Sequence, residues 1–214
     1  MIATNLNQVE TFIENSLVES FKTPNVESFG DLINIHSIGI IGAGTMGGGI
    51  AMNFANVGLP VTIIETNETQ LAAGLERVRV NYQRSADRGR FPQKEVQQRM
   101  NLINGGTTLS DLSGCDLIIE AVFENIEIKK KIFSELDKIA KPNSILATNT
   151  SGLDINSIAS MTSRPEDVIG LHFFSPANVM KLLEIVQAKH TKPIIIRSCM
   201  EIAKKINKIP VLVG

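Results

Sequence analysis

Short apolar runs alternate with longer amphipathic segments along most of the chain, beginning near residue 35. The short runs are rich in isoleucine and valine, as buried strands of a parallel sheet are. The longer segments repeat apolar residues at helical spacing. This alternation predicts a Rossmann-type α/β domain over residues 35–214, with a doubly wound, mostly parallel sheet and helices on both faces.

Turn-forming residues set the boundaries of these elements. Gly58 and Pro60 separate the first helix from the second strand, and Pro92 follows the end of the second predicted helix. Strands are expected at residues 35–41, 61–65, 102–103, 116–122, 145–148, 168–172, 182–186 and 209–213. Helices are expected at residues 46–57, 68–88, 94–100, 126–140, 155–160 and 194–206.

The first part of the chain, residues 1–34, has a different pattern. Apolar residues could line one face of a short helix between Leu6 and Leu17, and Thr23-Pro24 then breaks it. No residue in this part suggests chemistry. We expect residues 1–34 to be an N-terminal extension or a linker.

Composition excludes several classes of protein. The 214 residues carry a formal net charge of −1, so there is no electrostatic case for binding nucleic acid or an anionic membrane. No apolar run reaches the ~20 residues that span a bilayer. Cys115 and Cys199 lack the spacing of metal ligands, so we expect reduced thiols and no metal site. Acids such as Glu10 argue against a targeting presequence, which predicts a soluble cytoplasmic protein.

A glycine-rich segment follows the first predicted strand. Gly42, Gly44 and Gly47 fit the pattern G-x-G-x-x-G, with Thr45 and Met46 between them. The first glycine permits a sharp turn, the second lets a pyrophosphate approach the backbone, and the third lets the helix pack closely on the sheet. The helix would direct free N–H groups and its positive dipole end at the phosphates. A merely structural turn is the alternative, but the strand and helix around it favour dinucleotide binding.

Glu65 stands at the end of the second predicted strand, about where such a motif places a carboxylate for the adenosine ribose. It would accept hydrogen bonds from both ribose hydroxyls and repel a 2′-phosphate. No arginine follows closely, so NAD is favoured over NADP. An ordinary surface or capping acid is the alternative.

His172 comes at the carboxyl end of an apolar strand, at the edge where ligands bind in a doubly wound sheet. Glu184 lies inside the next apolar run, and a carboxylate there requires a partner. The two together would form a general base held in one tautomer. A structural histidine is the alternative that spacing alone leaves open.

Two polar features are ambiguous. The stretch Thr148-Asn-Thr-Ser-Gly152 follows a strand and could bind a substrate or cap the next helix. Glu124 precedes a helix, where an acid is also expected from the helix dipole alone.

Five ordered motifs identify a family. They are Gly42-Ala-Gly-Thr-Met-Gly47, Glu120-Ala-Val-Phe-Glu124, Thr148-Asn-Thr-Ser151, His172-Phe-Phe-Ser-Pro176 and Met180-Lys-Leu-Leu-Glu184. Together they resemble the NAD-binding domain of 3-hydroxyacyl-CoA dehydrogenases. The residues of these motifs are most similar to those of the multifunctional fatty-acid oxidation enzymes, in which this domain follows an enoyl-CoA hydratase domain. The resemblance covers residues 35–214.

The resemblance assigns roles within the site. It implies that His172 is the catalytic base, that Glu184 orients it, and that Ser151 bonds the substrate oxygen near the nicotinamide. It also implies that Glu124 and Lys129 line the cofactor site.

The resemblance further implies contacts with the acyl-CoA substrate. Asn81 and Arg88 fall where single-function members contact coenzyme A, although no distinctive motif anchors that match. Ser175 stands where those members often have asparagine, which leaves its role open.

The family resemblance implies an enzyme of fatty-acid β-oxidation that oxidises (S)-3-hydroxyacyl-CoA to 3-oxoacyl-CoA with NAD. Family members continue beyond this point into a helical domain that closes the substrate cleft and carries the dimer interface. We therefore expect a helical partner domain or a homodimer. The alternative is a cofactor-binding module with little activity alone. The β-hydroxyacid dehydrogenases share a similar glycine-rich start, but they have no place for a His172–Glu184 pair.

Overall fold

The computed structural model describes residues 31–214. The helix predicted within residues 1–34 lies outside the described part of the chain. The short stretch before the first strand lies against the C-terminal helix α7 (Pro193–Lys205), where the backbone N–H of Ile33 donates to Ser198 Oγ at 3.0 Å.

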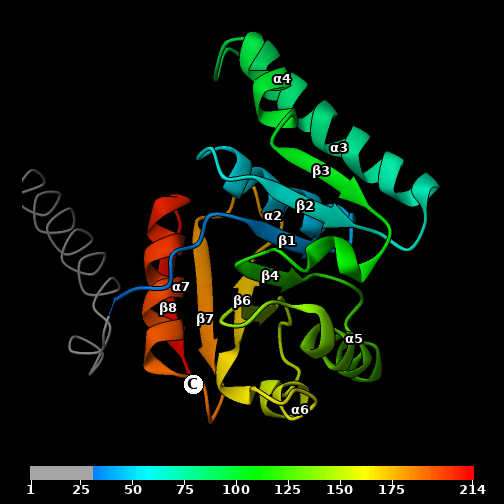
Figure 1. The fold of residues 1–214 in the computed structure, drawn as a ribbon. Helices are drawn as coiled ribbons and strands as arrows, with labels where there is room; N and C mark the ends of the chain where they lie inside the picture. The colour runs from blue at the N-terminus through cyan, green and yellow to red at the C-terminus, as the bar shows by residue number, and fades with distance from the viewer. Residues whose placement is uncertain (1–30) are drawn as a thin grey trace, which may run out of the picture.

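One sheet of eight strands organises the described residues, in the order β3-β2-β1-β4-β5-β6-β7-β8 (Figure 1). The first six strands of this order are parallel, β7 is antiparallel to β6, and β8 is parallel to β7. The prediction of a Rossmann-type, mostly parallel sheet is confirmed. The strands are β1 (Ile38–Ile41), β2 (Val61–Ile64), β3 (Ile103–Gly106), β4 (Leu117–Glu120), β5 (Ile145–Thr148), β6 (Val168–Phe173), β7 (Leu182–Gln187) and β8 (Ile209–Val213).

Helices cover both faces of the sheet because successive strand residues point to opposite sides. Ile38 and Ile40 of β1 join one apolar cluster, whereas Ile41 joins the other. The first cluster packs α2 (Thr45–Ala55), α3 (Glu68–Asp87), α4 (Lys94–Met100) and α7, and the second packs α5 (Ile126–Ile139), α6 (Ile155–Ala159) and η1 (Leu109–Leu112).

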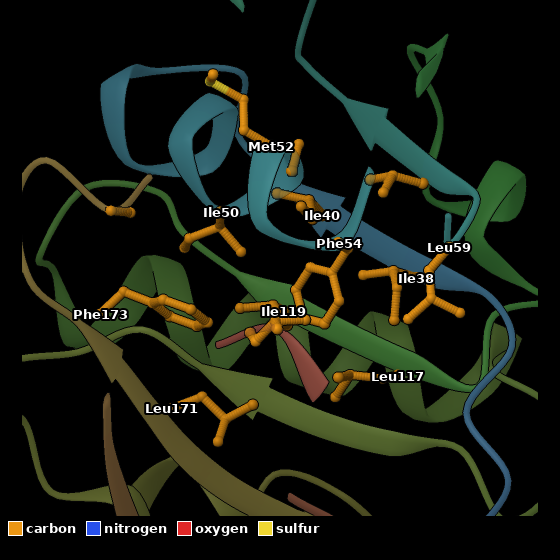
Figure 2. Packing of buried hydrophobic residues seen from close by; sticks show 14 of the residues in the cluster. Ile38, Ile40, Ile50, Met52, Phe54, Leu59, Leu117, Ile119, Leu171 and Phe173 are labelled. Carbon is orange, nitrogen blue, oxygen red and sulfur yellow. The ribbon is translucent and has the colours of Figure 1, made fainter. Parts of the chain in front are cut away.

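Helix α2 is the most deeply buried of these helices. Figure 2 shows Ile50 and Phe54 directed from α2 toward the strand residues Ile119 and Phe173, and all four are at most 1% exposed. Full burial of each such side chain contributes about 1.5–3 kcal/mol. The start of α2 is therefore held firmly at the carboxyl ends of the strands.

Two strand boundaries differ from the prediction by three residues, and several others differ by one or two. Strand β1 begins at Ile38 rather than at residue 35, and β3 extends through Asn104-Gly-Gly106 rather than ending at Ile103. A Cβ on Gly105 would lie 3.0 Å from the Leu71 side chain, so helix α3 packs closely on this strand and a larger residue would have to displace that side chain. Hydrophobic periodicity cannot reveal a strand that close packing has made glycine-rich.

Among the described residues there is no candidate membrane-spanning helix and no candidate metal cluster, and both cysteines are free thiols. Within residues 31–214, no helix combines the length and the apolar character needed to cross a membrane. The same residues contain no cluster of three or more His, Cys, Asp or Glu that could hold a metal ion. Burial raises the pKa of Cys115 to about 11 and that of Cys199 to about 12, so both thiols stay protonated at neutral pH.

Candidate active site

The glycine-rich turn joins β1 to α2, and its three glycines have different surroundings. Gly42 has a φ of +102°, and a Cβ there would lie 2.9 Å from the Ala121 carbonyl oxygen. A Cβ on Gly47 would lie 1.8 Å from the Gly42 carbonyl oxygen. A Cβ on Gly44 would have no atom within 4 Å. The fold therefore requires the first and third glycines, while the second faces open space.

The first turn of α2 begins beside that open space. Its N-cap is Gly44, so no side chain caps the helix, and the first turn contains no acidic residue. The N–H groups and the positive dipole end are thus available to an anion. An uncapped helix start beside a position without a Cβ fits the pyrophosphate of a dinucleotide.

A cavity of about 700 Å³ opens next to this turn, over the carboxyl ends of β1, β2 and β4. This is where the strand order reverses, the usual ligand site in such sheets. Thr45, Met46 and Glu65 line it together with an apolar wall formed by Ile41, Ile64, Leu109, Val122, Phe123, Ile128 and Ile132. The size and apolar wall suit an adenosine group.

Glu65 stands at the rim of the cavity directly after β2. Its Oε2 accepts a hydrogen bond from the Ala43 N–H at 3.0 Å, and its Oε1 accepts one from the Thr66 N–H at 2.8 Å. These bonds hold the carboxylate beside the glycine-rich turn. Each oxygen retains capacity for another donor, as recognition of a ribose requires.

A second, basic groove of about 360 Å³ lies on the other side of the α2 start, between α2, α3 and the loop after β6. The predicted residues Asn81 and Arg88 both line it. The sequence interpretation missed Arg77, Arg84 and Arg90, which line it as well. The signal was available, because residues 77, 81, 84 and 88 repeat at helical spacing along one face of α3 and onto its C-cap.

The charge of this groove is one-sided. No acidic residue occurs among the described residues that line it. Arg77 also holds the glycine-rich turn, because its Nη2 donates to the Ala43 carbonyl at 2.8 Å. Ser175 is exposed at the start of the loop after β6, and its neighbours Pro176 and Asn178 line the groove.

His172 and Glu184 face each other across two antiparallel strands. They are register partners on β6 and β7, and His172 Nδ1 lies 2.8 Å from Glu184 Oε2. Their side chains are 17% and 33% exposed. A carboxylate on Nδ1 fixes the orientation of the ring and leaves Nε2 as the nitrogen that can accept a proton.

Glu124 gathers the polar loop that follows β5. It accepts hydrogen bonds from the Ser151 N–H at 2.9 Å, from Ser151 Oγ at 3.3 Å and from Thr150 Oγ1. Burial opposes its ionisation, but these bonds and the ammonium of Lys129 at 3.4 Å outweigh that effect and lower the pKa of Glu124. The carboxylate is thus charged at neutral pH and orients Ser151.

Lys129 occupies a different position from the one expected. Its side chain is fully buried, and its Nζ donates to Glu120 Oε1 at 2.8 Å and Oε2 at 2.9 Å. Thr148 Oγ1 donates to the same carboxylate at 2.7 Å. The lysine therefore supports the site from below rather than lining it, because Glu120 ends β4 in the core and requires a cation there. The sequence signal that could have revealed this buried ion pair is an acid, Glu120, at the end of an apolar strand.

Asn149 joins the Ser151 loop to the strand that carries His172. Its Oδ1 accepts a hydrogen bond from the Phe173 N–H at 2.8 Å. The bond brings the ends of β5 and β6 together beyond their last ladder pair, Thr148 and Gly170. The structure thus places Ser151, Glu124 and the His172–Glu184 pair at the carboxyl edge of the parallel strands, the edge at which the glycine-rich turn after β1 also lies.

The profile of the family described as "3-hydroxyacyl-CoA dehydrogenase, NAD binding domain" matches residues 37–214. The chain belongs to this family. The cofactor of such a domain is NAD, in agreement with the glycine-rich turn and Glu65. The family predicted from the five motifs is confirmed.

Relatives match the chain over the same residues. The peroxisomal bifunctional enzyme of Cavia porcellus is 44% identical over 181 residues, which is 84% of this chain and 25% of that protein. A peroxisomal fatty acid beta-oxidation multifunctional protein of Arabidopsis thaliana is 41% identical, with the same two shares. The chain thus spans about a quarter of the length of these curated relatives.

Solved structures of related dehydrogenases have the same fold as this chain. Escherichia coli 3-hydroxybutyryl-CoA dehydrogenase superposes with a TM-score of 0.82 at 33% identity, covering 84% of this chain and 38% of that one. The dehydrogenase part of a Caenorhabditis elegans multifunctional enzyme gives 0.80 at 34% identity, covering 90% and 45%.

The prediction of a cytoplasmic protein is wrong. The relatives named above, from guinea pig and from Arabidopsis, are peroxisomal, and a Brassica napus relative is glyoxysomal. The prediction rested on the acidic N-terminal segment, and the first residues of a chain do not reveal every targeting signal.

Proposed function

We propose that this chain provides the NAD-binding part of an enzyme that oxidises (S)-3-hydroxyacyl-CoA to 3-oxoacyl-CoA in fatty-acid β-oxidation. The observation that carries the proposal is the His172–Glu184 bond of 2.8 Å at the same sheet edge as the glycine-rich turn. A general base and a dinucleotide site at one sheet edge are what oxidation of an alcohol requires. NAD, when bound, accepts the hydride released from C3 of the substrate.

The residues of the chain have separate tasks in this reaction. His172 Nε2 takes the proton of the C3 hydroxyl, and Glu184 stabilises the imidazolium that forms. Ser151 keeps its backbone bond to Glu124. Its hydroxyl, which donates weakly to Glu124 at 3.3 Å, turns to donate a hydrogen bond to the substrate oxygen instead. The substrate hydroxyl thus loses a proton to the protein while the hydride leaves from carbon.

The basic groove supplies the site for the coenzyme A part of the substrate. Coenzyme A carries phosphate groups, and arginine is the side chain best suited to bind them. Arg77, Arg84, Arg88 and Arg90 line the groove with Asn81. The groove adjoins the adenosine cavity at the start of α2, because Gly44 and Thr45 line both. Substrate and cofactor would therefore meet at the glycine-rich turn.

The reverse reaction tests the proposal. The purified chain of residues 1–214 is mixed with acetoacetyl-CoA and NADH, and the loss of NADH is followed. His172→Gln should lower turnover by roughly 10²–10⁴, the usual value of general-base catalysis. The same change at the exposed His36 is the matched control and should leave turnover unaltered. Both variants should bind NADH like the wild type, because neither residue lines the adenosine cavity.

Two results would contradict the proposal. An active His172→Gln variant would remove His172 as the base. A wild-type chain that binds NADH and consumes none of it with acetoacetyl-CoA would favour the alternative, a cofactor-binding module with little activity of its own.

A further inference from the structure

The loop of residues 174–181 connects the strand of His172 to the strand of Glu184 and forms one wall of the basic groove. Pro176, Asn178 and Val179 of this loop line the groove. The loop also rests on helix α2, because a Cβ on Gly49 would lie 3.1 Å from Ala177 Cβ. Its position thus decides the width of the groove.

Lys208 reaches this loop from the turn between α7 and β8. Its Nζ donates to the Ala177 carbonyl at 2.6 Å and to the Met180 carbonyl at 2.7 Å. Asn53 of α2 donates to the same Ala177 carbonyl at 3.0 Å. The loop is therefore fastened to two other elements through its backbone.

Burial of the Lys208 ammonium costs free energy of folding. The residue is 5% exposed, and within residues 31–214 no carboxylate lies within ion-pair distance of it. Burial lowers the pKa of Lys208 to about 8. An apolar residue would avoid that cost. What the lysine adds is a pair of hydrogen bonds to carbonyl groups of one loop, and its Nζ also lies 5.9 Å from the centre of the Phe173 ring.

We propose that Lys208 is a positioning residue that fixes loop 174–181 against α2 and thereby shapes the groove for the coenzyme A part of the substrate. The claim about coenzyme A rests on the proposed function, whereas the fastening of the loop does not. Lys208 itself lines neither the groove nor the adenosine cavity. It acts through the two carbonyl groups.

The two cavities respond differently if this is right. Loop 174–181 contributes three residues to the groove and none to the adenosine cavity. Loss of the Lys208 bonds should therefore weaken binding of coenzyme A and leave binding of NADH unchanged. General destabilisation of the fold would not separate the two affinities.

Hydrogen–deuterium exchange and ligand titration of Lys208→Met test the proposal. The N–H groups of Val179 and Met180 donate to the Pro176 carbonyl at 2.9 and 3.0 Å, so they report on the order of the loop. Their exchange should accelerate roughly tenfold or more in the variant, while amides of α2 and β4 keep their protection. Affinity for coenzyme A should fall by about tenfold with NADH affinity unchanged.

Lys205→Met is the matched control, because Lys205 is exposed three residues away, and it should change neither exchange nor affinity. If Lys208→Met does not fold, Lys208→Gln, which keeps an uncharged donor, is expected to give the same pattern in weaker form. Unchanged exchange at Val179 and Met180 would overturn the proposal, as would equal losses of both affinities.

The outcome also separates this proposal from the proposed function. A wild-type chain that binds no coenzyme A would contradict the assignment of the groove. Faster exchange in the loop of Lys208→Met would then still show that the lysine fastens it.

Discussion

Two glycines of the same turn should respond in opposite ways to the same added methyl group. Gly44 has φ −68° and ψ −171°, an ordinary conformation for alanine, and its Cβ would meet nothing within 4 Å. Gly44→Ala should therefore fold normally and be about 0.4–1 kcal/mol more stable, since alanine reduces the freedom of the unfolded chain. It should nevertheless weaken NAD binding by tenfold or more, because the methyl group occupies the space that the pyrophosphate needs.

Gly47→Ala should instead damage the fold. Its Cβ would be placed 1.8 Å from the Gly42 carbonyl oxygen, and real Cβ contacts are essentially never under 3.0 Å, so the turn and α2 must separate by at least about 1.2 Å. The neighbour is backbone and α2 is deeply buried, so little relaxation is available. Overpacking in a core costs about 1–3 kcal/mol and occasionally more, and we expect about 3 kcal/mol or more here.

Urea unfolding followed by circular dichroism measures the free energy of unfolding of both variants, because the chain has no tryptophan to report by fluorescence. Titration calorimetry measures their affinity for NAD. Wild-type NAD affinity in Gly44→Ala would refute the pyrophosphate assignment. Wild-type stability in Gly47→Ala would refute the close approach of α2 to the turn.

Two further predictions concern carboxylates. Glu65→Ala should weaken NAD binding by about tenfold to a hundredfold and reduce the preference over NADP, since hydrogen bonds to a charged group contribute about 1.5–3 kcal/mol; an unaltered ratio of the two affinities would contradict this. Burial opposes ionisation of Asp116, but Lys141 at 2.6 Å and hydrogen bonds from His36 and Ser37 lower its pKa to about 2. The stability that the Asp116 carboxylate adds is fully present above pH 3.8 and is lost as the pH falls through about 2. Above pH 3.8, wild type should be more stable than Asp116→Asn by about 1–2 kcal/mol after solvent screening. Urea unfolding at several pH values should show this difference vanish as the pH falls to about 2.

Local features of the chain could be predicted from the sequence alone. The positive φ of Gly42 and the contact of Gly47 with the Gly42 carbonyl both belong to one turn, so the spacing of the glycines indicates them. Strand β5 at Ile145–Thr148 and helix α4 at Lys94–Met100 begin and end where the pattern places them. Periodicity and turn residues determine these elements because the decisive interactions lie a few residues apart.

The partners of the polar groups were decided by the tertiary structure. The sequence suggested His172 as the partner of Glu184, and the antiparallel register of β6 and β7 is what sets the two residues opposite each other. Lys129 is nine residues from Glu120 and was expected to line the cofactor site, yet burial of the strand end draws it into an ion pair. Periodicity predicts which face a side chain occupies, and only the register and packing of neighbouring elements decide what it meets there.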